Sequence, residues 1–131
     1  MENKIKKFLI KHHLGIAAWL FGSTVKKPEN PHDDLDLAIL FAFSHEPAYP
    51  EMVEWRESLS SLLKKPVDLV IMNRANPILK FQVFRYGQKI LDREEKTTTR
   101  FIVQSLMEYY DIQKMRAPFY QQILKGRRYG G

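Results

Sequence analysis

Two aspartates have the residue type and the spacing to face one divalent metal ion. Asp34 and Asp36 lie two residues apart in a segment where acidic or small residues alternate with apolar ones, as on a β-strand. Side chains at that spacing point to the same face of a strand, roughly 6.5–7 Å apart. Two carboxylates so close repel each other and resist joint ionisation. A hard cation with oxygen ligands relieves that repulsion, and Mg²⁺ suits such a site best.

Asp68 is the third acid, and it stands at the start of the apolar run 67–72. An acid in such a run is expected only at the end of a strand. If this strand lies beside the Asp34–Asp36 strand, all three carboxylates converge. Three carboxylates can hold two metal ions roughly 3.5–4 Å apart, the arrangement used for in-line displacement at phosphorus. We therefore predict Asp34, Asp36 and Asp68 as catalytic and metal-binding residues.

A Gly-Ser pair precedes these acids and has the composition of a phosphate-binding turn. Gly22 follows the apolar run 16–21 and permits both a sharp turn and the close approach of a phosphate. The N–H groups that follow it, with the Ser23 hydroxyl, can bind phosphate oxygens. Lys26 or Lys27 adds a positive charge. We predict Gly22, Ser23 and Lys26 as nucleotide-binding residues.

Each of these features has an ordinary structural explanation when it is taken singly. A Gly-Ser pair after a strand is usually only a turn, and Asp-x-Asp is more often a solvated strand edge or a cap. A lone acid such as Asp68 is most often exposed at a strand end. The three features together, in this order and in a strand–loop–strand context, favour a site.

The hydrophobic pattern predicts the elements that must position these residues. Helical spacing alternates along the chain with short apolar runs and with period-two alternation. Asn76 is expected to cap a helix that has Pro77 at its first position, and Pro118 to stop or kink the last helix. The predicted helices are 3–13, 50–64, 77–86 and 96–115, and the predicted strands are 16–21, 34–41, 67–72 and a short edge strand at 89–91. Strands interleaved with helices predict an α/β (α+β) domain, a small mixed sheet flanked by helices, with a long C-terminal helix.

Composition narrows the class of protein. With 131 residues, 44% hydrophobic and 27% charged, the chain suits one compact domain. It has no cysteine, which excludes disulfide scaffolds, zinc-thiolate clusters and thiol catalysis. The sequence has no run long and apolar enough for a membrane span and no signal-peptide pattern, so we expect a cytoplasmic protein without membrane contact. Lys and Arg exceed Asp and Glu by 21 − 15 = 6. This excess suggests a polyanionic partner, such as nucleic acid or a nucleoside triphosphate, or simply a charged surface that favours solubility.

The order Gly22-Ser23, then Asp34-Leu35-Asp36-Leu37, then Asp68 on a later strand resembles the polymerase-β-like nucleotidyltransferase superfamily. Within it, the sequence is most similar to the minimal nucleotidyltransferases of the MntA type, which are antitoxin partners of HEPN-domain RNases. The likeness extends through 67–73, Pro77, Gly87 and 89–91, and covers roughly residues 1–95. We therefore expect a nucleotidyltransferase core at 1–95, a helical extension packed on it at 96–125, and a flexible tail at 126–131.

The resemblance implies an activity, cofactors and a partner. Asp34, Asp36 and Asp68 form the implied catalytic triad, with two Mg²⁺ ions, and Gly22 and Ser23 bind the triphosphate of ATP. The implied reaction transfers AMP from ATP to a tyrosine of a HEPN toxin, and so neutralises it. In that scheme Asp34 and Asp36 bind both metal ions, while Asp68 binds the one nearest the nucleophile and helps to deprotonate it.

The sequence departs from the family pattern at two places, and alternatives stay open. Val25-Lys26-Lys27 stands where the family often has Ala-Arg-Gly, and Asp33 where Ser is common. The alternatives are a catalytically inactive antitoxin that binds by occlusion, a transferase acting on a small molecule or an RNA end, and a nucleic-acid binder, which is not favoured. A further hypothesis is a docking surface formed by the aromatics of the last helix and the basic C-terminus, namely Tyr109, Tyr110, Phe119, Tyr120 and residues 125–128.

Overall fold

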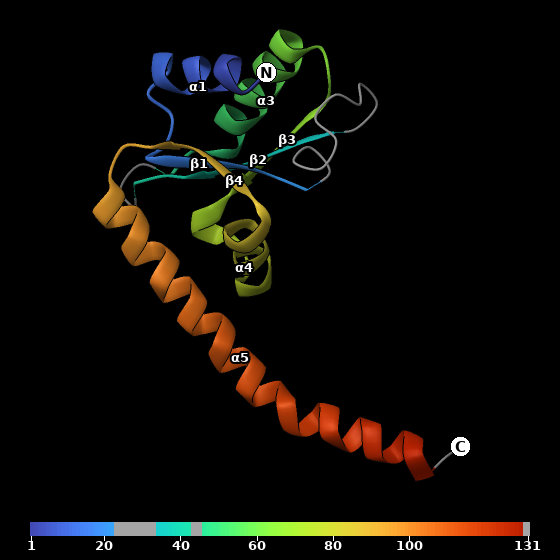
Figure 1. Ribbon diagram of the computed structural model, residues 1–131. Coiled ribbons are helices and arrows are strands. Elements are labelled where there is room, and N and C mark those ends of the chain that lie inside the picture. Colours follow the sequence, from blue (N-terminus) through green and yellow to red (C-terminus); the bar gives the residue numbers. More distant parts are fainter. Residues whose placement is uncertain (23–33, 43–45, 130–131) are drawn as a thin grey trace.

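The computed structural model describes residues 1–22, 34–42 and 46–129, with the backbone alone at 120 and 124–129. The predicted order of helices and strands is confirmed (Figure 1). In chain order the elements are α1 (Glu2–Lys11), β1 (Ala17–Phe21), β2 (Leu35–Leu40), α3 (Tyr49–Leu63), β3 (Val67–Ile71), the 3₁₀ turn η2 (Met72–Arg74), α4 (Pro77–Tyr86), β4 (Gln88–Asp92) and α5 (Glu95–Tyr129).

The four strands form one mixed sheet in the order β3-β2-β1-β4. Strand β1 pairs antiparallel with both β2 and β4, and β2 pairs parallel with β3. The parallel pair needs a crossover, and α3 supplies it between the two strands. Strand β4 lies at an edge of the sheet, as predicted for residues 89–91.

The sheet separates two hydrophobic clusters because successive strand residues point to opposite faces. On β2, Leu35, Leu37 and Ile39 pack toward α1 and α3, while Ala38 and Leu40 pack toward α4 and the start of α5. Figure 1 shows α1 and α3 on one side of the sheet and α4 on the other. The predicted fold class, a small mixed sheet flanked by helices, is confirmed.

Polar side chains fix the turn after β3 and the start of α4. The Asn76 side chain accepts a hydrogen bond from the Leu79 N–H at 2.9 Å, which is the predicted cap. Asn73 in η2 pairs with the backbone of Phe41 in both directions, accepting from its N–H at 2.9 Å and donating to its carbonyl at 2.8 Å. This amide thus continues the backbone pairing just past the end of β2.

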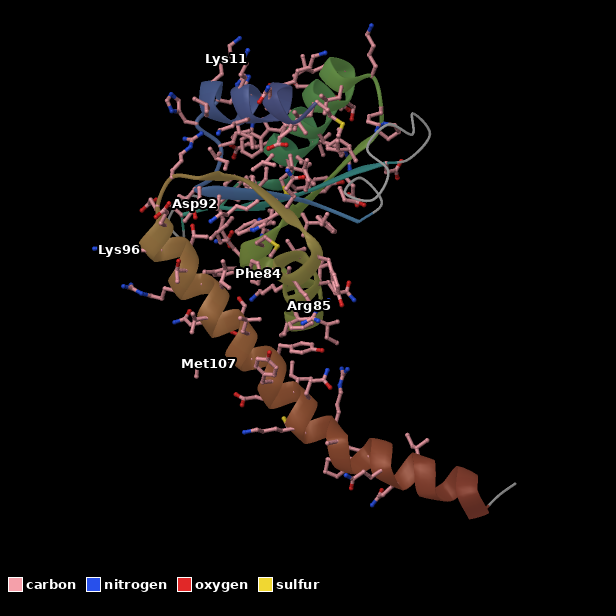
Figure 2. The ribbon with its side chains drawn as sticks, viewed as in Figure 1. Lys11, Phe84, Arg85, Asp92, Lys96 and Met107 are labelled. Carbon is pink, nitrogen blue, oxygen red and sulfur yellow. The ribbon has the colours of Figure 1, made fainter. Side chains whose placement is uncertain are left out.

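Aromatic residues hold α4 and α5 together. Phe84 packs edge-on against Trp19 of the sheet and Phe101 of α5, with ring centroids 5.4 and 6.1 Å apart, and Figure 2 shows it between these elements. The Phe81 ring stacks on Tyr109 at 3.8 Å. Phe84 is therefore partly buried against the core, and Tyr109, which we expected on a docking surface, makes a contact within the chain.

The last helix differs most from its prediction. It runs from Glu95 to Tyr129, so of the two outcomes predicted for Pro118, a stop or a kink, the stop is wrong; residues 126–129, predicted as part of the tail, continue the helix. Pro118 is exposed, so the carbonyl that loses its N–H partner there faces water, which lowers the cost of an internal proline. Figure 1 shows that α5 changes direction along its C-terminal half and extends away from the sheet. Among the described residues, no helix has the length and apolar character needed to cross a bilayer.

Candidate active site

The sheet brings Asp36 and Asp68 side by side. In the parallel pairing of β2 with β3, the Cα atoms of Asp36 and Asp68 are register partners, and in the antiparallel pairing of β1 with β2, Phe21 is the partner of Asp36. The three residues form a row across the sheet, and Asp34 immediately precedes β2. The sequence predicted that the three acids converge if the Asp68 strand lies beside the Asp34–Asp36 strand. The pairing of β2 with β3 meets this condition.

Asp36 is the central acid of this group. It is half-buried, whereas Asp34 and Asp68 are exposed. Loss of hydration raises the pKa of the Asp36 carboxyl above its ordinary value, and the negative charges of Asp68 and Asp34 raise the pKa further. Asp36 is thus close enough to both other acids to be affected by their charge. A cation placed among the three would offset that repulsion.

Gly22 lies directly against Asp36. Its φ of +71° is in the left-handed region that glycine adopts without strain, and a Cβ at this position would collide with the Asp36 carboxylate. Because Phe21 pairs with Asp36, the turn at Gly22, just after the end of β1, lies beside β2 at Asp36. The other predicted phosphate contacts lie outside the described residues, namely Ser23, Lys26 and Lys27. Asp33, one of the departures from the family pattern, lies outside them as well.

A cavity of about 630 Å³ opens beside the acids. Asp34 and Asp68 line it together with residues of α3 and the start of β3, namely Arg56, Glu57, Ser60, Ser61, Pro66 and Val67. The Ser60 hydroxyl accepts a hydrogen bond from the Val67 N–H at 3.1 Å, which fixes the start of β3 and so the position of Asp68. Sequence reasoning did not find the α3 residues, because in the sequence they show only a helical pattern.

The donor set of the three acids fits Mg²⁺ in its chemistry. All three offer carboxylate oxygens, the ligands that Mg²⁺ prefers. Within the described ranges, no three acidic or histidine side chains are already gathered tightly enough to hold a metal ion. The three-acid metal site therefore stays a prediction, supported by the register of β2 and β3 and by the raised pKa of Asp36.

Comparison with protein families identifies the class of this domain. The model of the polymerase beta nucleotidyltransferase family matches residues 3–96, which include the whole sheet and all three acids. The chain belongs to this family. The resemblance that the Gly-Ser and aspartate motifs suggested is confirmed. Over 91 residues the chain is also 28% identical to the "Putative protein adenylyltransferase" of Methanocaldococcus jannaschii, covering 70% of this chain and 95% of the relative.

Solved nucleotidyltransferase structures share the fold, including the long C-terminal helix. A toxin–antitoxin structure with AMP-PNP has a chain 27% identical to this one, with a TM-score of 0.78 over 94% of this chain and 98% of its own. A chain of an MntA–HepT toxin–antitoxin crystal structure is 26% identical, with a TM-score of 0.72 over 94% and 96%. A third match, 27% identical with a TM-score of 0.73 over 94% and 95%, comes from the complex of a tri-AMPylated Shewanella oneidensis HEPN toxin with its MNT antitoxin. The structural neighbours of this nucleotidyltransferase are antitoxins of HEPN toxin–antitoxin systems.

Proposed function

We propose that this nucleotidyltransferase is an antitoxin that transfers AMP from ATP to a tyrosine of a partner HEPN toxin. The observation that carries the proposal is the Asp36–Asp68 register pair, with Asp34 beside it and Gly22 against Asp36. The similarity to antitoxins that were solved with AMP-PNP or with an AMPylated toxin supports the nucleotide and the acceptor.

The proposed reaction is a displacement at the α-phosphorus of ATP. The tyrosine oxygen forms a bond to that phosphorus, the bond to the β-phosphate bridging oxygen breaks, and pyrophosphate leaves. The phenolic proton passes to Asp68, the exposed acid on the edge strand, or through it to water. Asp34, Asp36 and Asp68 would hold the Mg²⁺ ions, which supply charge stabilisation to the attacking and leaving oxygens when they are bound.

The cavity beside the acids gives the reactants room. Asp34 and Asp68 form part of its wall, so a group lying in it lies next to the proposed catalytic carboxylates. Gly22, on the β1 side of Asp36, lets the turn that follows it approach a phosphate closely. The proposed site thus has a phosphate-binding side at the end of β1 and an open side at the edge strand β3.

The test is an AMP-transfer assay with Mg²⁺, ATP labelled at the α-phosphate, and a HEPN toxin as the candidate acceptor. We expect Asp36→Asn to lower the rate of toxin labelling by about three orders of magnitude or more, because charge stabilisation in the transition state is lost. The matched control is Glu95→Gln, which removes an exposed carboxylate at the start of α5 and should label the toxin at the wild-type rate. Equal labelling by wild type and Asp36→Asn would refute the proposal.

Neutralisation by occlusion is the second candidate. Lys26-Lys27 in place of the family's Arg-Gly favours it. The discriminating variant replaces Asp34, Asp36 and Asp68 by Asn together. Full protection of cells against the toxin by this variant would support occlusion and count against AMP transfer, whereas loss of protection with retained toxin binding would support transfer.

A further inference from the structure

The C-terminal half of α5 exposes a row of large apolar side chains. Met115, Phe119 and Ile123 are 73%, 68% and 54% exposed. They follow one another at intervals of four residues, so they lie along one face of the helix. We call these three residues the α5 stripe. Isolated exposed apolar residues are ordinary, but a continuous row of this size marks an interaction site.

The α5 stripe continues the face by which α5 packs on its own domain. In the first half of the helix, Phe101 and Ser105 are buried against α4 and the sheet, and Ile112 is half-buried. Ile112 and Phe119 follow Ser105 at successive steps of about two helical turns, so the three lie on nearly the same face. The face that is covered by α4 in one half is therefore open in the other, where the helix has passed beyond the domain (Figure 1).

The opposite face of α5 has a different character. Val103, Met107 and Tyr110 are exposed there, beside the part of the helix that packs on α4. Figure 2 shows Met107 on the side of the helix away from α4. These side chains lie across the helix from the α5 stripe, so a single partner helix cannot cover both sets. The α5 stripe is the better candidate because it is free of any other element along its length.

The charges around the α5 stripe select the chemistry of its partner. Arg116 flanks it and is exposed, Lys114 is exposed on the opposite face of the same segment, and the sequence adds Lys125, Arg127 and Arg128 farther along the chain. From residue 111 to the end, these five basic residues face one acid, Asp111, a balance of 5 − 1 = +4. A second copy of the same segment would bring the same positive charge against it. An apolar groove bordered by carboxylates would complement both the stripe and the charge.

We propose that the α5 stripe docks the partner protein, by entering an apolar groove with an acidic rim. This inference rests on the proposed function for the identity of the partner, the HEPN toxin, and assigns the surface that holds it. Solved antitoxin chains that align with 94% of this chain are found in complexes with such toxins. Docking through a projecting helix leaves the cavity beside Asp34 and Asp68 open for the acceptor tyrosine.

Binding of the purified toxin, measured by titration calorimetry, tests the docking surface. The test variant is M115E/F119E, which places two carboxylates on the stripe, and the matched control is A117E/Q121E, which places two on the opposite face of the same exposed segment. Both variants change the charge equally, and none of the four side chains is buried, so both should fold. We expect M115E/F119E to weaken binding at least about 100-fold and the control to weaken it less than about 5-fold.

Several outcomes would overturn the inference. Equal Kd values for the two variants, or no toxin binding by the wild type, would show that the stripe does not dock the toxin. Stripe-dependent binding to vesicles of anionic lipid, without stripe-dependent toxin binding, would assign the surface to membranes. Stripe-dependent dimerisation of the protein alone would assign it to a second copy. Stripe-dependent toxin binding without AMP transfer would keep the inference and refute only the transferase proposal.

Discussion

At the scale of single residues, Asp36 is the acid whose charged form the fold disfavours. Its pKa is raised by loss of hydration and by the charges of Asp68 and Asp34. A raised pKa means that the folded chain binds a proton more readily than the unfolded chain, so ionised Asp36 costs stability. That cost is present in full above the raised pKa and disappears as the pH falls toward the ordinary aspartate value near about 4. Repulsion of this kind is what a bound cation offsets.

We predict that Asp36→Asn raises the melting temperature at pH 7 without divalent ions, because it removes the ionised group. The gain should shrink as the pH is lowered toward about 4, where wild-type Asp36 becomes protonated as well. Added Mg²⁺ should raise the melting temperature of the wild type more than that of the variant. Differential scanning fluorimetry over a pH series, with Asp111→Asn as the control, checks all three results. An Asp36→Asn variant that melts lower than wild type at pH 7 would contradict this account.

The three acids could be found from sequence because their chemistry and their spacing are both local. Asp34 and Asp36 are two apart on a strand, and Asp68 interrupts an apolar run. Arg56 and Ser60, which line the cavity beside them, could not be found in this way. Their positions on α3 carry no local signal, and only the packing of α3 against β3 places them near Asp68.

At the scale of elements, Asp92 joins β4 to α5. Its carboxylate accepts hydrogen bonds from the Thr98 hydroxyl at 2.9 Å and the Glu94 N–H at 3.2 Å, and pairs with the Lys89 ammonium at 3.0 Å. Thr98 is fully buried, so its hydroxyl depends on this partner. Asp92 therefore ties the end of β4 both to the turn before α5, through the Glu94 N–H, and to the first turn of the helix, through the Thr98 hydroxyl.

We predict that Asp92→Ala lowers the free energy of unfolding by about 2 kcal/mol, because it removes the hydrogen bond to the Glu94 N–H and leaves the buried Thr98 hydroxyl without its partner. Thr98→Val removes that hydroxyl, and it should lower the free energy of unfolding by less than Asp92→Ala does. In the double variant, the loss of stability should be smaller than the sum of the two single losses, since the second change removes the unsatisfied hydroxyl. Urea unfolding of the four proteins measures this coupling. Strict additivity would show that the Asp92–Thr98 bond contributes nothing.

Some element boundaries followed from a local signal, as the start of α4 did from the Asn76 cap and Pro77. The pairing of strands did not. The parallel register of β2 with β3 depends on the crossover through α3, which no local pattern specifies. The contact of Asn73 with Phe41 was missed for the same reason, because the two residues are far apart in the chain.

At the scale of the whole molecule, the sequence predicted a single domain with a long final helix but not how far that helix extends. The apolar pattern ended at about 115, Pro118 predicted a stop or a kink, and the helical extension was expected to reach 125, whereas α5 continues to Tyr129. A proline rule reports the local cost of a lost hydrogen bond, and that cost is small where the freed carbonyl faces water. The consequence is a domain whose last helix reaches beyond its own core, carrying the α5 stripe with it.

The two halves of α5 should therefore differ in what their removal does. A chain that ends at Ile112 loses no buried side chain among those that the structure describes, so its melting temperature should stay within about 4 °C of the full chain. A chain that ends at Glu94 also loses Phe101, Thr98 and Ser105, which are buried against α4 and the sheet, and should not fold cooperatively. Circular dichroism at rising temperature compares the two.

The same truncation separates folding from recognition. If the α5 stripe serves only a partner, the chain ending at Ile112 should keep its fold and its affinity for ATP, yet lose its affinity for the toxin. If the stripe instead packed on its own domain in solution, the truncated chain would melt well below the full one. The first account predicts that truncation abolishes toxin binding and leaves the melting temperature nearly unchanged. The second predicts a clear fall in the melting temperature, because apolar area that is buried within the domain stabilises its fold.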